Sequence, residues 1–133
     1  MSAAANELLR AVHATLTEDE SLTALVGVDG IRDRLVTGRH LPCVIVSELV
    51  TTDYSTATEP GEQHVLTLQV WSDASGQKQV QQIASVVGSL LQDARLPLET
   101  VSLVNLQHLD TKTRREAKTR LFSAEMRFRA VTE

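Results

Sequence analysis

The chain has 133 residues, of which 42% are hydrophobic and 23% are charged. This composition is that of an ordinary globular domain and excludes a disordered, collagen-like or coiled-coil protein. Aromatic residues make up only 3%, which disfavours a nucleic-acid surface built on stacked bases. The single Cys43 cannot form an internal disulfide, the first seven residues lack the features of a signal peptide, and no apolar run is long enough to cross a bilayer. We therefore expect one domain over residues 1–133, made in a reducing cytoplasm, with no membrane partner.

The net charge of −4 is unevenly distributed. Residues 1–111 hold 6 Lys/Arg and 14 Asp/Glu, whereas residues 112–133 hold 7 Lys/Arg and 3 Asp/Glu. An acidic body with a basic segment could steer copies of the chain into head-to-tail contact or a ring. The simpler alternative, which the charge pattern alone favours, is a solvated basic hairpin without a partner.

Two helices are predicted at the start of the chain. Apolar residues recur at helical spacing over residues 3–16 and predict an amphipathic helix. Thr17 and Glu20 fit a capping box for a short second helix, which Gly27 would end.

A third helix is predicted over residues 80–94, where apolar residues follow the i, i+3, i+4, i+7 pattern. Pro97 lies where this helix could not easily continue, and Gly88 inside it indicates close packing against a backbone. The candidates for its N-cap are Ser72, Asp73 and Ser75.

Strands are predicted at 31–36 (a short edge strand), 43–50, 64–71, 101–110 and 119–131. The last strand alternates, with these residues expected to face the core: Phe122, Ala124, Met126, Phe128 and Ala130. The order of elements predicts an α+β fold: a mostly antiparallel sheet of four to five strands packed against two or three helices, with a long loop or hairpin arm.

Two connections stand out as candidate interaction surfaces. Residues 51–63 are polar, rich in turn residues and too long for a tight hairpin, so they predict a projecting arm. Residues 111–118 predict a basic hairpin tip. Trp71 is either an interface anchor or a core residue. The candidate interaction residues are Asp53, Tyr54, Glu59, Glu62, Trp71, Lys112, Arg114, Arg115, Lys118, Arg120, Arg127 and Arg129.

No credible active site is evident in the sequence. Cys43 with His40 nearby suggests a thiol and a base, but a cysteine opening an apolar strand is usually a small buried hydrophobe. The four histidines lack the spacing of zinc ligands, and we expect His64 and His108 to be interface or half-buried residues. Carboxylates in the predicted arm are more often solvated or bonded to backbone donors than catalytic. We expect no enzyme activity, no cofactor and no metal.

Two binding roles stay open beside a protein–protein role. The basic run from Lys112 to Arg120 could contact phosphates of duplex DNA, without sequence preference and in a salt-sensitive way. We rank this below a protein–protein contact because the remainder of the chain is acidic. A small-ligand or protein-binding α+β module without catalysis is the main alternative, although no polar constellation marks a pocket.

Several segments together resemble the tail terminator, or tail completion, proteins of long-tailed phages and gene transfer agents. The most specific matches are the strand from His64 to Ser72, with its tryptophan, and the ending Arg127 to Glu133. The chain departs from the family pattern at 116–121, where an Asp-Gly-type turn is more usual, and at Glu99-Thr100, where a glycine is common. The further matching segments are Leu22-x-x-Leu25-Val26-Gly27, Pro42-Cys43-Val44-Ile45-Val46 before Glu48, Asp53-Tyr54-Ser55-Thr56, Glu62-Gln63 and Leu103-Val104-x-Leu106.

The resemblance implies a structural role in a virion-type particle. Such proteins form a hexameric ring on the last ring of the tail tube, stop its elongation and provide the surface that joins tail to head. The implied partners are other copies of the chain, the tail tube protein and a head-completion or adaptor protein, at the head–tail junction. DNA would pass through the lumen of the ring without specific binding.

Overall fold

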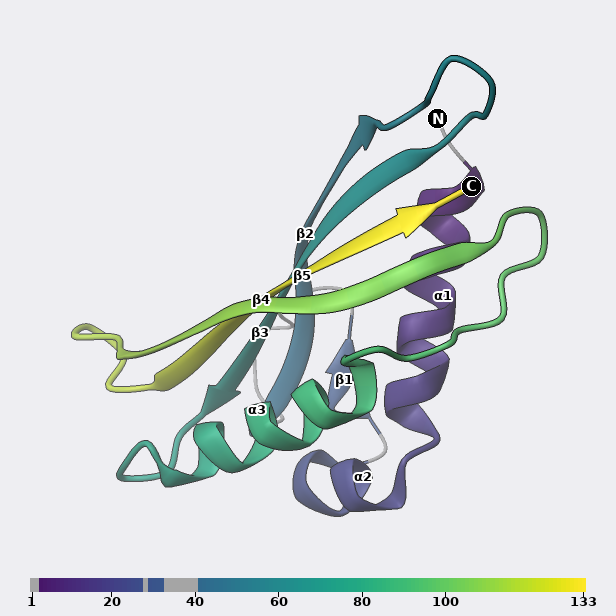
Figure 1. Ribbon diagram of the computed structural model, residues 1–133. Helices are drawn as coiled ribbons and strands as arrows, with labels where there is room; N and C mark the ends of the chain where they lie inside the picture. Colours follow the sequence, from purple (N-terminus) through teal and green to yellow (C-terminus); the bar gives the residue numbers. More distant parts are fainter. Residues whose placement is uncertain (1–2, 28, 33–40) are drawn as a thin grey trace.

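The fold is an α+β arrangement of one five-stranded sheet and three helices, as expected from the sequence. A computed structural model describes residues 3–27, 29–32 and 41–133 (Figure 1). The elements in chain order are α1 (Ala3–Thr17), α2 (Glu20–Val26), β1 (Ile31–Arg32), β2 (Cys43–Asp53), β3 (Glu62–Ser72), α3 (Lys78–Leu91), β4 (Leu103–Arg115) and β5 (Phe122–Thr132).

The sheet has the strand order β1-β2-β3-β5-β4. β1 is parallel to β2, and the other three pairs are antiparallel. β3 and β5 pair without interruption from Glu62 opposite Thr132 to Ser72 opposite Phe122. This regular pair is the centre of the sheet. The edge strand expected over 31–36 is seen as Ile31–Arg32, and residues 33–36 lie outside the described part.

The hydrophobic core lies between one face of the sheet and the helices. Because side chains alternate along a strand, every second residue of β3 and β5 faces this layer. The opposed pairs Leu66–Phe128, Leu68–Met126 and Val70–Ala124 are all buried. The inward residues predicted for the last strand are therefore confirmed. The helices contribute Leu8, Val12 and Leu16 from α1, Leu22 and Val26 from α2, and Val80, Ile83, Ala84, Val87 and Leu91 from α3.

The predicted starts of α2 and α3 were wrong. The N-cap of α2 is Asp19, whose carboxylate accepts a hydrogen bond from Leu22 N at 2.9 Å, whereas Thr17 is the last residue of α1. Carboxylates and hydroxyls both cap helices well, so the choice between Thr17 and Asp19 depended on where α1 ends. α3 begins at Lys78 after Gln77, which makes no capping side-chain bond.

Gly27 ends a helix as predicted, whereas Gly88 makes a close contact with a different kind of group from the one expected. Gly27 ends α2 at φ 84°, a conformation that glycine adopts without strain. A Cβ at Gly88 would lie 3.5 Å from Met126 Cε, so α3 packs closely at this point against a side chain and not against a backbone.

His64 is a buried polar residue of the core, and the expectation of a half-buried or interface position was wrong. It lies on β3 between two hydroxyls: Nδ1 is 2.8 Å from Thr51 Oγ1, and Nε2 is 3.0 Å from Thr132 Oγ1. Both ring nitrogens therefore have partners, which offsets the cost of burying the ring. This environment could not be predicted from the neighbours of His64 in the chain, because the two threonines belong to the flanking strands β2 and β5.

Burial lowers the pKa of His64, against a smaller opposing effect of Glu62. Because the unfolded chain binds a proton more readily than the folded one, unfolding should become easier as the pH falls below the ordinary histidine pKa of about 6.5. We expect urea midpoints measured from pH 8 to pH 5 to fall more steeply for the wild type than for His64→Gln. Equal slopes would show that His64 does not carry this pH dependence.

Candidate interaction surfaces

The face of the sheet opposite the core carries many of the residues singled out from the sequence. None of the three described helices packs on this face. Trp71 lies on it, half-buried, and its Nε1 donates to Gln69 Oε1 at 3.2 Å. Trp71 is thus not part of the helix-facing core, and its role as an interface anchor stays a prediction.

The arm is shorter than the loop predicted over 51–63. β2 continues to Asp53 and β3 begins at Glu62, so the connection is confined to 54–61. The extra strand residues were not predicted because they are polar: 51–53 of β2 pair with β3, and Glu62 and Gln63 of β3 pair with both β2 and β5. The result is a β-hairpin that projects beyond the helices, as seen at the top of Figure 1.

Polar bonds within the arm give it a defined shape. Asp53 Oδ1 accepts from Ser55 N at 3.0 Å and from Ser55 Oγ at 2.6 Å, and these bonds lower the Asp53 pKa. Thr56 N donates to Glu59 O at 2.8 Å, and Glu59 N donates to Thr56 Oγ1 at 3.0 Å. The carboxylates of Asp53 and Glu59 remain exposed. The arm therefore presents negative charge from an ordered turn.

An aromatic–cation contact joins the base of the arm to the open face. The Arg129 guanidinium carbon lies 5.4 Å from the centre of the exposed Tyr54 ring. Arg129 Nε also donates to Gln63 Oε1 at 2.7 Å. Tyr54, Glu59 and Arg129, all predicted interaction residues, line one small pocket together with Asn105 and Glu133.

The basic tip also differs from its predicted bounds of 111–118. β4 continues to Arg115, and the connection to β5 is 116–121. Because neighbouring residues of a strand face opposite sides, Arg114 and Arg115 point to different faces of the sheet. Arg114 lies 4.0 Å from Glu116 in an exposed ion pair, which contributes little to stability.

Arg120 has a left-handed backbone, with φ 60°. Its N–H donates to Glu116 O at 2.8 Å, and Glu116 N donates to Leu121 O at 2.8 Å, which closes the turn. A residue with a Cβ is less stable than glycine in this conformation, by about 1–2 kcal/mol. Residues with a strained backbone conformation tend to cluster at functional sites of proteins.

Replacing Arg120 by glycine separates the stability of the tip from its charge. Glycine at this position would remove the strain but lose more entropy on folding, so we expect Arg120→Gly to raise the free energy of unfolding by roughly 0.5–1 kcal/mol. Urea unfolding of the purified chain measures this. Arg120→Lys, which keeps the charge and the strain, is the matched control. A lower stability of Arg120→Gly than of the control would show that the turn is not strained.

Arg127 lies between the two ends of the sheet and is paired within its own chain. Its Nη2 lies 2.5 Å from Asp110 Oδ2 on β4, and its Nε bonds to both carboxylate oxygens. These hydrogen bonds lower the pKa of Asp110 and raise that of Arg127. This bidentate geometry fixes the orientation of both side chains. Arg127 is less available for a partner than the cations of the tip.

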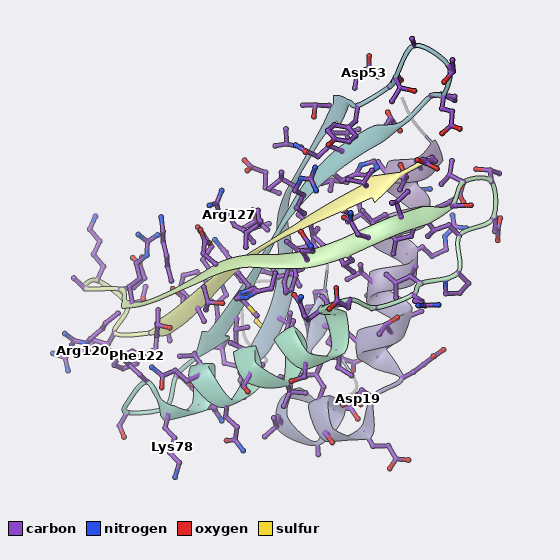
Figure 2. The ribbon with its side chains drawn as sticks, in the orientation of Figure 1. Asp19, Asp53, Lys78, Arg120, Phe122 and Arg127 are labelled. Carbon is purple, nitrogen blue, oxygen red and sulfur yellow. The ribbon has the colours of Figure 1, made fainter. Side chains whose placement is uncertain are left out.

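The arm and the tip lie at opposite ends of the sheet. In Figure 2, Asp53 marks one end, Arg120 the other, and Arg127 lies between them. Ten residue steps of β5 separate Thr132, beside the arm, from Phe122, beside the tip, which is about 33 Å at 3.3 Å per residue. The arm carboxylates and the tip cations of one chain are therefore too far apart to contact each other.

The described residues contain no group of three or more His, Cys, Asp or Glu that could hold a metal ion. Burial raises the pKa of the Cys43 thiol, which is inaccessible, and His40 lies outside the described residues. In addition, no helix in the described ranges has the length and apolar character needed to cross a membrane.

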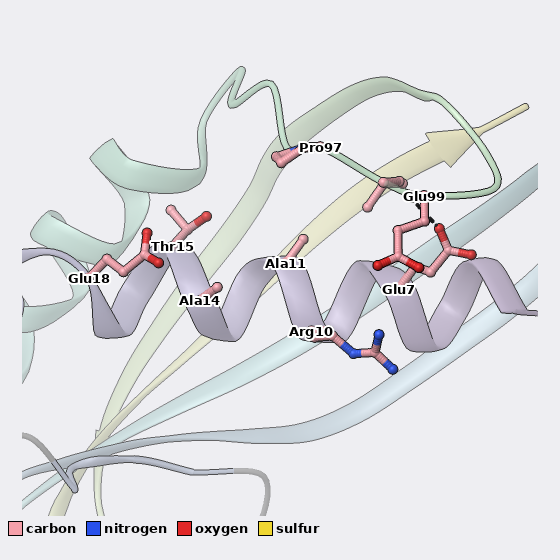
Figure 3. Close-up of a pocket in the computed structure, with 9 residues that line it drawn as sticks. Glu7, Arg10, Ala11, Ala14, Thr15, Glu18, Pro97 and Glu99 are labelled. Carbon is pink, nitrogen blue, oxygen red and sulfur yellow. Dashed lines mark hydrogen bonds between the residues drawn. The ribbon is translucent and has the colours of Figure 1, made fainter.

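A second pocket lies between α1 and the segment before β4 (Figure 3). Glu7 is its most engaged residue: Oε1 accepts from Glu99 N at 2.6 Å and from Thr100 N at 2.8 Å, and the Thr100 hydroxyl bonds to Oε2. The Thr100 side chain is the main cause of the lowered Glu7 pKa. A carboxylate held by three donors of its own chain anchors this segment to α1 and is a poor proton acceptor for chemistry.

Several residues of these surfaces were not predicted. Gln63 and Asp110 meet their partners across strand pairs, Asn105 and Glu133 line a pocket with residues of the arm, and Glu7 meets residues more than ninety positions away. Periodicity identifies strands and faces, but it does not identify which strands are neighbours. No local signal in the sequence could have found these pairs.

Comparison with known proteins decides the family. The family model described as "Tail completion protein gp17" matches residues 10–133. The chain belongs to this tail completion family. A comparison with curated protein sequences gives no match.

The tail completion chain is also similar to a solved structure over its full length. The match is to a chain of a structure described as "Virion of native gene transfer agent (GTA) particle", at 31% identity with a TM-score of 0.91. The alignment covers 100% of this chain and 99% of that one. The resemblance inferred from the sequence is therefore confirmed at the level of the family, which is one of structural phage tail proteins.

Proposed function

We propose that this tail completion protein is a tail terminator. It forms a hexameric ring that caps the tail tube, stops its elongation and joins the tail to the head of a phage or gene transfer agent particle. The observation that carries the proposal is the full-length match, at 31% identity, to a chain of a gene transfer agent virion. The partners are other copies of the chain, the tail tube protein and a head-completion or adaptor protein.

The surfaces of the chain support a role based on contacts rather than on chemistry. The candidate thiol is buried, and the Glu7 carboxylate is occupied by backbone and hydroxyl donors. In contrast, the acidic arm and the basic tip project from opposite ends of the sheet. Two different surfaces on one chain suit a heterologous contact that closes by rotation. The arm and the tip contact neighbouring subunits or the rings above and below.

The charge of the chain also suits a DNA passage. Residues 1–111 carry an excess of carboxylates, and phosphates are held by cations rather than by carboxylates. A ring whose acidic residues face the lumen would let DNA slide through without specific binding.

The capping activity can be measured with purified components. Tail tube protein is assembled in the presence and absence of the purified chain, and tube lengths are measured by negative-stain electron microscopy. We expect shorter tubes of narrower length distribution, with the chain bound at one end. A length distribution that does not change with the concentration of the chain would contradict the proposal. A ligand-dependent rise in melting temperature would instead favour the small-ligand alternative.

A further inference from the structure

The pocket at the base of the arm is an acceptor-rich surface on the open face of the sheet. It has a volume of about 160 Å³ and is bounded by the arm and by β4 and β5. Glu59 contributes a carboxylate from the arm, and Glu133 contributes another. Reciprocal backbone bonds of 2.9 Å between Glu133 and Ser102 hold Glu133 in place. The pocket volume is sufficient for one long side chain.

The donors and acceptors of the pocket are not balanced. Arg129 is its only cation among the described lining residues, and this cation is already engaged by Gln63 and by the Tyr54 ring. Asn105 Oδ1, in the wall, makes no hydrogen bond with any described residue. Because this oxygen is buried, the capacity of the pocket for a positively charged donor comes from the exposed carboxylates of Glu59 and Glu133, which form no ion pair with any described residue.

The tip of the same chain supplies cations of this kind. Arg115, Lys118 and Arg120 are exposed, and none of them has a carboxylate within 4.0 Å in the described part of the chain. Arg120 is held in its left-handed conformation by the turn at the end of the hairpin. The tip is narrow and projects beyond the helices (Figure 1). Its positive charge complements the carboxylates of the pocket, whose volume suits one long side chain of the tip.

The pocket and tip of one chain cannot meet. They lie at the two ends of β5, about 33 Å apart by its length in residues. We propose that the basic tip of one copy inserts into the pocket at the base of the arm of the next copy, with Lys118 or Arg120 facing Glu59 and Glu133. Since each copy offers one tip and one pocket, repetition of this contact links copies head to tail, and it forms a ring when the rotation from one copy to the next closes. This inference rests on the proposed function and names the contact by which its ring forms.

A disulfide cross-link tests the contact in assembled particles. The double variant Ala117→Cys/Pro60→Cys places one thiol on the tip and one at the pocket, both at exposed positions. Oxidation of particles that carry it should give a ladder of covalent multimers on non-reducing gels. The control Ala117→Cys/Ser85→Cys, with the second thiol on the exposed side of α3, should remain monomeric. The buried Cys43 is present in both variants and does not contribute. A pocket variant that cross-links no more than the control would overturn the inference.

A charge swap covers the case in which the cysteine variants do not assemble. Arg120→Glu and Glu59→Arg should each reduce the number of joined particles, and the double variant should recover at least half of them. Independent losses that add in the double variant would overturn the contact. These tests are separate from a test of the proposed function. If the cysteine variant cross-links but a strain that lacks the gene still makes normal joined particles, the contact stands and the terminator role is wrong. If the strain that lacks the gene makes defective particles but the cysteine variant does not cross-link, the terminator role stands and the contact is wrong.

Discussion

Particles that carry Arg114→Glu/Arg115→Glu should be joined at least about tenfold less often than wild-type particles, with the chain still folded. Like charges across a contact cost several kcal/mol, and each 1.4 kcal/mol is a factor of ten. Both arginines are exposed at the end of β4, so their reversal removes no core contact. The readout is the ratio of joined particles to free heads and tails in electron micrographs.

A matched control distinguishes a local effect from a change of total charge. Arg10→Glu/Arg95→Glu makes the same change of net charge at exposed positions away from the tip. We expect it to leave the yield of joined particles close to wild type. Circular dichroism and urea unfolding should show both double variants folded. A normal yield for the Arg114/Arg115 variant would remove the tip from the mechanism.

The largest effect on stability is expected for Phe128→Ala. Phe128 is completely buried on β5 between Leu66 of β3 and His108 of β4, and its ring centre lies 5.3 Å from that of His108. Removal of a buried phenylalanine side chain costs about 3–5 kcal/mol. For a domain of this size that corresponds to a fall in melting temperature of about 10–18 °C.

Tyr54→Ala is the control for this prediction, because Tyr54 is 53% exposed. It removes an aromatic ring of similar size from a surface contact with Arg129, so we expect a fall of no more than a few degrees by the same scale. Differential scanning fluorimetry of the two variants gives the comparison. A fall for Phe128→Ala no larger than that for Tyr54→Ala would mean that the β3–β5 pair is not the centre of the core.

The sequence predicted the class of fold and the faces of its main elements because periodicity records burial directly. The alternation of Phe122, Ala124, Met126, Phe128 and Ala130 identified the inward face of β5, and the helical spacing around Val80–Leu91 identified α3. Element ends were less predictable. Polar residues at the ends of β2 and β4 extend each strand beyond its apolar part, because pairing with a neighbour satisfies their backbone groups.

The candidate interaction residues were predictable as exposed charges but not as surfaces. Glu59 and Arg129 are 70 positions apart in the chain and line one pocket, whereas Arg127 is paired with Asp110. His64 was misjudged for the same reason: its partners, Thr51 and Thr132, come from strands on either side. These contacts depend on the order of the strands in the sheet, which the sequence of a single segment does not predict.

The most direct test of the proposed role is negative-stain electron microscopy of particles from a producing host in which this gene has been deleted, with the gene restored in trans as the control. We predict overlong tail tubes, or heads and tails that remain separate, and recovery of joined particles on complementation. Normal joined particles in the deletion strain would contradict the terminator role.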